Sequence, residues 1–214
     1  MPTEPNNFIA SLVDDLQPVR AMRTRDGLAL AASAGAITVA LTILLLGLRP
    51  DVAQGQFQPL FLFANGVLLI VSLGSALAAV RMGMPRVGQS GRGWKWVVAL
   101  IGLSPATALI MLASGTEPIP TTLITSHELK CVAMGLALSL LTATALIWWL
   151  RRGAPTSTER AGLLVGLSSA GIGIFAFAFH CPYDSFYHVG LWHVLPVAIG
   201  AVVGRLLVPR LVRW

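Results

Sequence analysis

The chain has 214 residues, of which 55% are hydrophobic and only 11% are charged, and its mean hydropathy is +0.75. Soluble domains carry about 25% charged residues, so this composition excludes an ordinary soluble domain and indicates an integral membrane protein. The net charge of +6 does not indicate nucleic-acid binding, because no aromatic and basic patch or known recognition motif accompanies it.

The N-terminal segment 6–25, NNFIASLVDDLQPVRAMRTR, predicts a short amphipathic helix ahead of the first apolar run. Four apolar residues recur at the spacing of one helical face, i, i+3, i+4 and i+7. They are Ile9, Leu12, Val13 and Leu16. Pro18 ends or kinks the helix. Such a stripe can lie on the bilayer or in the groove of a partner protein. Asp14 and Asp15 are unfavourable beside anionic lipid, which favours a protein partner.

Six apolar runs follow, each long enough to cross the roughly 30 Å hydrocarbon core of a bilayer as a helix. They are 28–48, 59–80, 96–112, 131–150, 161–179 and 190–207. We therefore predict an all-α integral membrane protein with two parts, a cytoplasmic tail over 1–26 and a six-helix transmembrane domain over 27–214. Within the last two runs, the pairs Gly162/Gly166 and Gly200/Gly204 have the small-xxx-small spacing of close helix contacts.

The distribution of basic residues predicts the orientation. With six spans, 13 of the 15 lysines and arginines fall on one side of the membrane, and only Arg49 and Lys130 fall on the other. Basic residues concentrate in cytoplasmic loops. We therefore expect both termini to be cytoplasmic and the loops 49–58, 113–130 and 180–189 to face outward.

All four histidines and both cysteines fall on the predicted outer side, most of them in the stretch FHCPYDSFYHVGLWH. On this outer side, six residues are candidate metal ligands, namely His127, Cys131, His180, Cys181, Asp184 and His188. His193 begins the last span. Three interpretations stay open. These residues can simply suit a wet interface, with the cysteines as small apolar fillers. The cysteines can form a disulfide in an oxidising compartment. Thiolates and imidazoles can also bind zinc or another soft divalent metal.

Other classes of function fit the sequence less well. A metal-ion transporter or channel, the main alternative, would continue its ligands down the spans, but no span has an Asp, Glu, Lys or Arg near its centre. An intramembrane enzyme would need an acid or base beside Ser168 and Ser169, and a thiol oxidoreductase would need a second cysteine near each thiol. An assembly scaffold would use the glycine faces alone. We therefore predict a protein that is not an enzyme.

Several stretches, SLVDDLQPVRAM, LLLGLRPD, WWLRRGAP, HCPYDSFYHVGLWH and GRLLVPRLVRW, resemble the NrsF family of six-span bacterial membrane anti-sigma factors. The resemblance implies a multi-pass protein of the bacterial inner membrane, in contact with lipid and making no direct contact with nucleic acid. It also implies that the tail sequesters an extracytoplasmic-function sigma factor. On the outer side, it implies that Cys131 and Cys181 sense heavy-metal or oxidative stress and trigger release of the sigma factor.

Overall fold

The computed structural model describes residues 5–14, 21–84, 102, 105–106, 109–115 and 126–212. Within these ranges the regular elements are all helical, and five of them are long and apolar enough to cross a membrane. They are α2 (Thr24–Leu46), α4 (Pro59–Met82), α6 (Ser126–Arg151), α7 (Thr158–Ala178) and the segment 188–212, which comprises η1 (His188–Trp192) and α8 (Leu195–Val212). They confirm five of the predicted spans. The predicted span 96–112 lies largely outside the described residues and stays a prediction.

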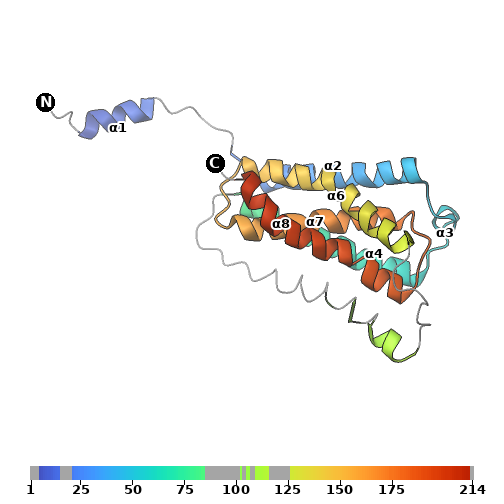
Figure 1. Ribbon diagram of the computed structural model, residues 1–214. Helices are drawn as coiled ribbons and strands as arrows, with labels where there is room; N and C mark the ends of the chain where they lie inside the picture. The colour runs from blue at the N-terminus through green and yellow to red at the C-terminus, as the bar shows by residue number, and fades with distance from the viewer. Residues whose placement is uncertain are drawn as a thin grey trace.

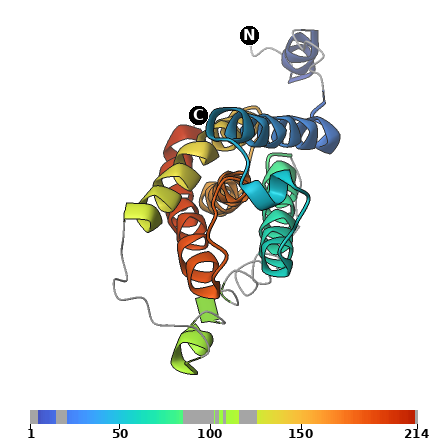
Figure 2. The same cartoon turned by 90° about the vertical axis from the view of Figure 1, so that its right-hand side faces the viewer.

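Helix α7 occupies the centre of the bundle. Figure 2 shows α2, α4, α6 and α8 arranged around it, and α7 has extensive contacts with each of them. In its most apolar 18-residue window, 89% of the residues are buried, whereas α2 and α6 each bury 28% of theirs. The other four helices therefore offer most of the surface available to lipid, while α7 is enclosed by protein.

Small residues let the neighbouring helices approach α7 closely. A Cβ atom at Gly166 would overlap the backbone of Gly200, and one at Gly162 would overlap the backbone of Gly204. The two predicted glycine pairs thus pack against each other across the α7–α8 interface, which confirms their role as close helix contacts. On another face of α7, a Cβ atom at Gly173 would overlap the backbone of α6. The serine and glycine content of α7 is therefore a packing requirement.

The bundle has two distinct ends (Figure 1). The proximal end, where α2 begins and α8 ends, is tied together by backbone and side-chain hydrogen bonds. There the Trp149 indole donates to the Val80 carbonyl (3.0 Å), and the Ala154 amide donates to the Gly83 carbonyl (3.2 Å). The opposite end, here called the distal end, holds the short helix α3 (Pro50–Ala53) and the 179–188 loop.

A helix also forms in the N-terminal tail. Helix α1 (Pro5–Asp14) lies apart from the bundle at its proximal side (Figure 1). Of the predicted stripe, Ile9 and Val13 are 58% and 57% exposed. The side chain of Leu12 and the whole of Leu16 lie outside the described residues, so the complete amphipathic face stays a prediction.

Candidate functional site

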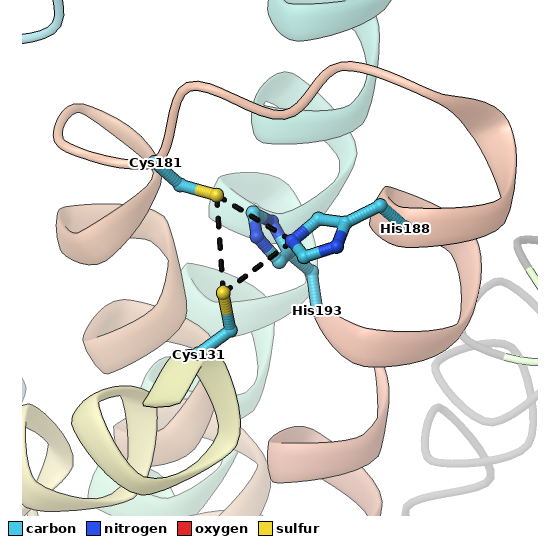
Figure 3. Close-up of side chains that lie close together, drawn as sticks. All are labelled: Cys131, Cys181, His188 and His193. Atoms are coloured by element: carbon cyan, nitrogen blue, oxygen red, sulfur yellow. Dashed lines mark hydrogen bonds between the residues drawn. The ribbon is translucent and has the colours of Figure 1, made fainter. Parts of the chain in front are cut away.

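Two cysteines and two histidines converge at the distal end (Figure 3). The Sγ atoms of Cys131 and Cys181 are 3.9 Å apart, and Nε2 of His188 lies 3.4 Å from the first and 3.5 Å from the second. His193 completes the group, in which one ligand atom from each of the four residues lies within 4.8 Å of all the others. All four side chains are at most 4% exposed. We call these four residues the Cys/His cluster.

Three parts of the chain supply the cluster. Cys131 lies in the second turn of α6, and Cys181 follows directly after the end of α7. His188 and His193 come from the start of the last span, and Ser185 orients this segment because its hydroxyl accepts a hydrogen bond from the His188 amide (3.1 Å). The cluster therefore forms only when α6, α7 and α8 are packed together.

The π-helical turn η1 explains why two histidines five positions apart share one face. In a regular α-helix with 3.6 residues per turn, side chains at i and i+5 point about 140° apart. A π turn has i→i+5 hydrogen bonds and more residues per turn, so it brings the two positions into line. The ring centroids of His188 and His193 are 5.2 Å apart. Sequence periodicity gave no signal for this turn, and His193 was therefore not among the predicted ligands.

The structure brings together three of the six candidate ligands, Cys131, Cys181 and His188, and adds His193. It places the other three apart from this group for separate reasons. His127 is exposed and its ring stands edge-on to Tyr183, with centroids 5.5 Å apart. The His180 ring donates from Nδ1 to the Gly47 carbonyl (3.2 Å). Asp184 is engaged by an arginine.

That arginine, Arg49, is 5% exposed and joins the end of α2 to the loop that carries Cys181. Its guanidinium donates to both carboxylate oxygens of Asp184 and to the Cys181 carbonyl (3.0 Å). It also donates twice to Asp51, at 2.6 Å each. The fork of donors on an arginine suits such bidentate pairing. Hydrogen bonds to Asp184 and Asp51 raise the pKa of Arg49, and the hydrogen bonds from Arg49 lower the pKa of Asp51, so the Arg49–Asp51 ion pair persists across the physiological pH range.

A small cavity separates this arginine from the Cys/His cluster. Its lining includes Arg49, Asn65, Cys181, Asp184 and His193. Two of the buried polar atoms of these residues have no hydrogen-bond partner, the Asn65 Oδ1 and the His193 Nε2. Buried polar atoms are nearly always satisfied. Among the described residues, the His193 Nε2 is therefore an unsatisfied buried atom in the ring that borders both the cavity and the cluster.

The two thiols of the cluster differ in how readily they ionise. Both cysteines are free thiols. The hydrogen bond from the Cys131 thiol, followed by that from His188, lowers the pKa of Cys181, although burial acts in the opposite direction. A thiolate is the form that binds metals and attacks oxidants. Cys181 is therefore the readier of the two sulfurs for either reaction.

The fold and the cluster together define a helical membrane protein with a buried thiol and imidazole group at the end opposite its termini. Residues 12–214 match the model of the NrsF family, described as negative regulator of sigma F. The chain belongs to this family, which confirms the resemblance noted in the sequence.

Two relatives match over most of their length. The chain is 28% identical to the probable anti-sigma-F factor NrsF of Azospira oryzae, over 97% of this chain and 98% of that protein. It is 30% identical to the anti-sigma-F factor NrsF of Caulobacter vibrioides, over 87% of this chain and 88% of that protein. No solved structure matches the chain.

Proposed function

We propose that this protein is a membrane anti-sigma factor that holds an extracytoplasmic-function sigma factor and releases it under metal or oxidative stress. The observation that carries the proposal is the family match, which extends from within α1 to the last residue and so includes both the tail and the bundle. The regulatory role named for both relatives is thereby extended to this chain. A binding protein of this kind needs no catalytic centre.

In this proposal the protein spans the bacterial inner membrane with its proximal end in the cytoplasm. The described basic residues support this orientation. Most of them lie near the proximal ends of the helices, whereas Arg49 and Lys130 lie at the distal end. Basic residues favour the cytoplasmic side. The Cys/His cluster then faces the periplasm, where metals and oxidants from outside arrive first.

The tail, residues 1–26, would hold the sigma factor. Ile9 and Val13 share one face of α1 and are both more than half exposed. A helix of 10 residues with an uncovered apolar face is typical of segments that dock in a partner's groove. Leu12 and Leu16 would complete the stripe. Because α1 is close to α2 in sequence, a sigma factor bound to the tail would lie near the proximal end of the bundle.

The Cys/His cluster would be the sensor, with Cys131 and Cys181 as its reacting groups. It is buried, it lies at the end of the molecule opposite the tail, and it joins three segments of the bundle. A change in its ligands or its oxidation state alters how these segments pack. The alternative of a metal-ion transporter is less well supported, because the described metal-ligand group is confined to the distal end.

Binding of a sigma factor is the direct test. The full-length protein, purified in lipid nanodiscs, should retain the sigma factor encoded by the same organism, and a form lacking residues 1–26 should not. A soluble peptide of residues 1–26 should compete for the interaction. Retention that is equal with and without the tail would contradict the assignment of the tail, and no retention at all would contradict the function.

A further inference from the structure

We propose that Cys131, Cys181, His188 and His193 hold one zinc ion in the resting protein as a closed tetrahedral site. The regulatory role of this zinc ion rests on the proposed function, because the ion would be what the sensor holds before stress. The binding itself rests only on the geometry and chemistry of the four side chains.

The three distances among Cys131, Cys181 and His188 match the edges of a tetrahedron around zinc, and His193 offers a ligand atom within 4.8 Å of the other three. With Zn–S bonds of about 2.3 Å and Zn–N bonds of about 2.0–2.1 Å, a regular tetrahedron places two sulfurs about 3.8 Å apart and a sulfur and a nitrogen about 3.5 Å apart. The Cys131 and Cys181 sulfurs are 3.9 Å apart, and the His188 nitrogen lies 3.4 and 3.5 Å from them. A disulfide instead needs the two sulfurs at about 2.05 Å.

The charge of the site fits its burial. Two thiolates and two neutral imidazoles around Zn²⁺ give a net charge of zero, and a buried site tolerates a neutral group far better than an isolated charge. Arg49 and Asp184, the charged residues that line the neighbouring cavity, are paired with each other. They therefore leave the charge balance of the cluster unchanged.

His193 provides an independent sign of a missing bond. Its ring is 3% exposed, and its Nε2 is buried without a hydrogen-bond partner. The π turn that aligns it with His188 is itself an unusual element, and π turns occur frequently at functional sites. A metal bond to the His193 ring would give a role to the turn that aligns the two histidines.

The bound ion would join α6, the loop after α7 and the start of the last span. Each zinc bound displaces one proton from each of the two thiols, so binding releases two protons when both start protonated. A more thiophilic divalent ion such as Cd²⁺ can take the place of zinc at the same two sulfurs, with larger bond lengths. Stress would then reach the protein as an exchange of ions, and the altered packing would be the signal.

Metal analysis of the full-length protein in nanodiscs tests this proposal. We expect one zinc per chain and, after replacement by Co²⁺, the absorption of a tetrahedral cobalt–thiolate site. His193→Gln should weaken binding by more than the roughly 100-fold that loss of an outer-shell partner can cost. The matched control His127→Gln, at the same end of the molecule, should bind zinc like the unmodified protein. Zinc or cobalt binding that is absent, or equally affected by both substitutions, would overturn the site.

The unmodified protein supplies a second test that does not depend on the folding of a variant. Zinc should protect both cysteines from a thiol reagent, and a chelator should expose them. Cysteines found joined in a disulfide, or equally reactive with and without zinc, would contradict the proposal. Retention of the sigma factor is measured on the same sample. If the purified protein contains no zinc but holds the sigma factor, only the metal site is refuted. If it contains zinc but does not hold the sigma factor, only the proposed function is refuted.

Discussion

Arg49 forms a forked ion pair with Asp184, a residue 135 positions later in the chain, at the point where α2 ends. The backbone reinforces this contact, because the Arg49 amide donates to the Phe179 carbonyl (2.9 Å). Helix α2 leads at its other end toward the tail. Arg49 therefore connects the loop that carries Cys181 to the helix that follows the tail, and we propose that this contact is part of the route by which the cluster signals to the tail.

Replacing Arg49 by Lys should weaken this connection. Lysine keeps the charge but offers a single ammonium group in place of the guanidinium fork, so it cannot hold Asp184, Asp51 and the Cys181 carbonyl together. We expect a loss of about 1.5–3 kcal/mol in the free energy of unfolding, measured by thermal unfolding, and higher sigma-dependent transcription without stress. The exposed Arg160→Lys is the control. A melting temperature and a reporter output like those of the unmodified protein would show that Arg49 is not part of the route.

The two cysteines should behave as one unit. Because both sulfurs belong to the same cluster, Cys131→Ser, Cys181→Ser and the double substitution should all abolish the transcriptional response to cadmium to the same extent, and the effects should not add. Ser126→Ala, on the exposed start of α6, should respond normally. A reporter assay with and without metal measures this. A full response in either single variant would remove that cysteine from the sensor.

The apolar face of α1 should determine affinity for the sigma factor. Ile9→Ala with Val13→Ala removes apolar carbons worth roughly 0.8 kcal/mol each when buried, or about 4 kcal/mol together, which corresponds to a loss of affinity on the order of a thousandfold when the partner buries both side chains. Ser11→Ala should change affinity little. Binding is measured with the full-length protein in nanodiscs and the labelled sigma factor. Equal losses in the two variants would show that the helix does not dock by this face.

Close packing of α7 on α8 should make Gly166 intolerant of a side chain. In Gly166→Ala the new Cβ would overlap the Gly200 backbone, and overpacking of this kind costs about 1–3 kcal/mol. Gly74→Ala is the matched control, because a Cβ there has no atom of the described residues within 4 Å. Thermal unfolding in detergent should show a lower melting temperature for Gly166→Ala only. Equal melting temperatures would mean that the two helices separate at little cost.

The proposed orientation predicts where fused reporters work. A reporter that is active only in the cytoplasm should be active after Trp214, and a reporter that is active only in the periplasm should be active when inserted in the 49–58 loop. The excess of arginine at the proximal end is the physical reason. The opposite pattern of activities would place the Cys/His cluster in the cytoplasm and remove its access to external metals.

The helices could be predicted from the sequence because each depends on the residues of its own segment. Runs of apolar residues long enough to cross a bilayer leave the backbone few alternatives to a helix, and the bounds of α4 and α7 lie close to those expected. The close helix contacts at the glycine pairs could also be predicted, because a spacing of four residues places both glycines of a pair on one face of the helix. The sequence did not predict which helix occupies the centre of the bundle, because the apolar content of α7 resembles that of the helices exposed to lipid.

The cluster was predicted only in part, for reasons that concern single residues. Cys131 and Cys181 were expected to come close because they flank the outer ends of spans, and their sulfurs lie 3.9 Å apart. His127 and His180 were expected to converge on the same point, but the structure places both apart from the cluster. His193 was missed because a π turn has no simple sequence period. Asp184 was expected near a metal, but the buried guanidinium of Arg49 engages it, and a contact over this separation in sequence leaves no local pattern.

The central position of α7 has a consequence for how the molecule is made. Its glycines meet the backbones of neighbouring helices, so the packing of α7 is complete only when those neighbours are in place. Helices α2, α4 and α6 precede it during synthesis, but α8, which covers its glycine face, follows. A chain interrupted before α8 would leave that face uncovered and would lack His193.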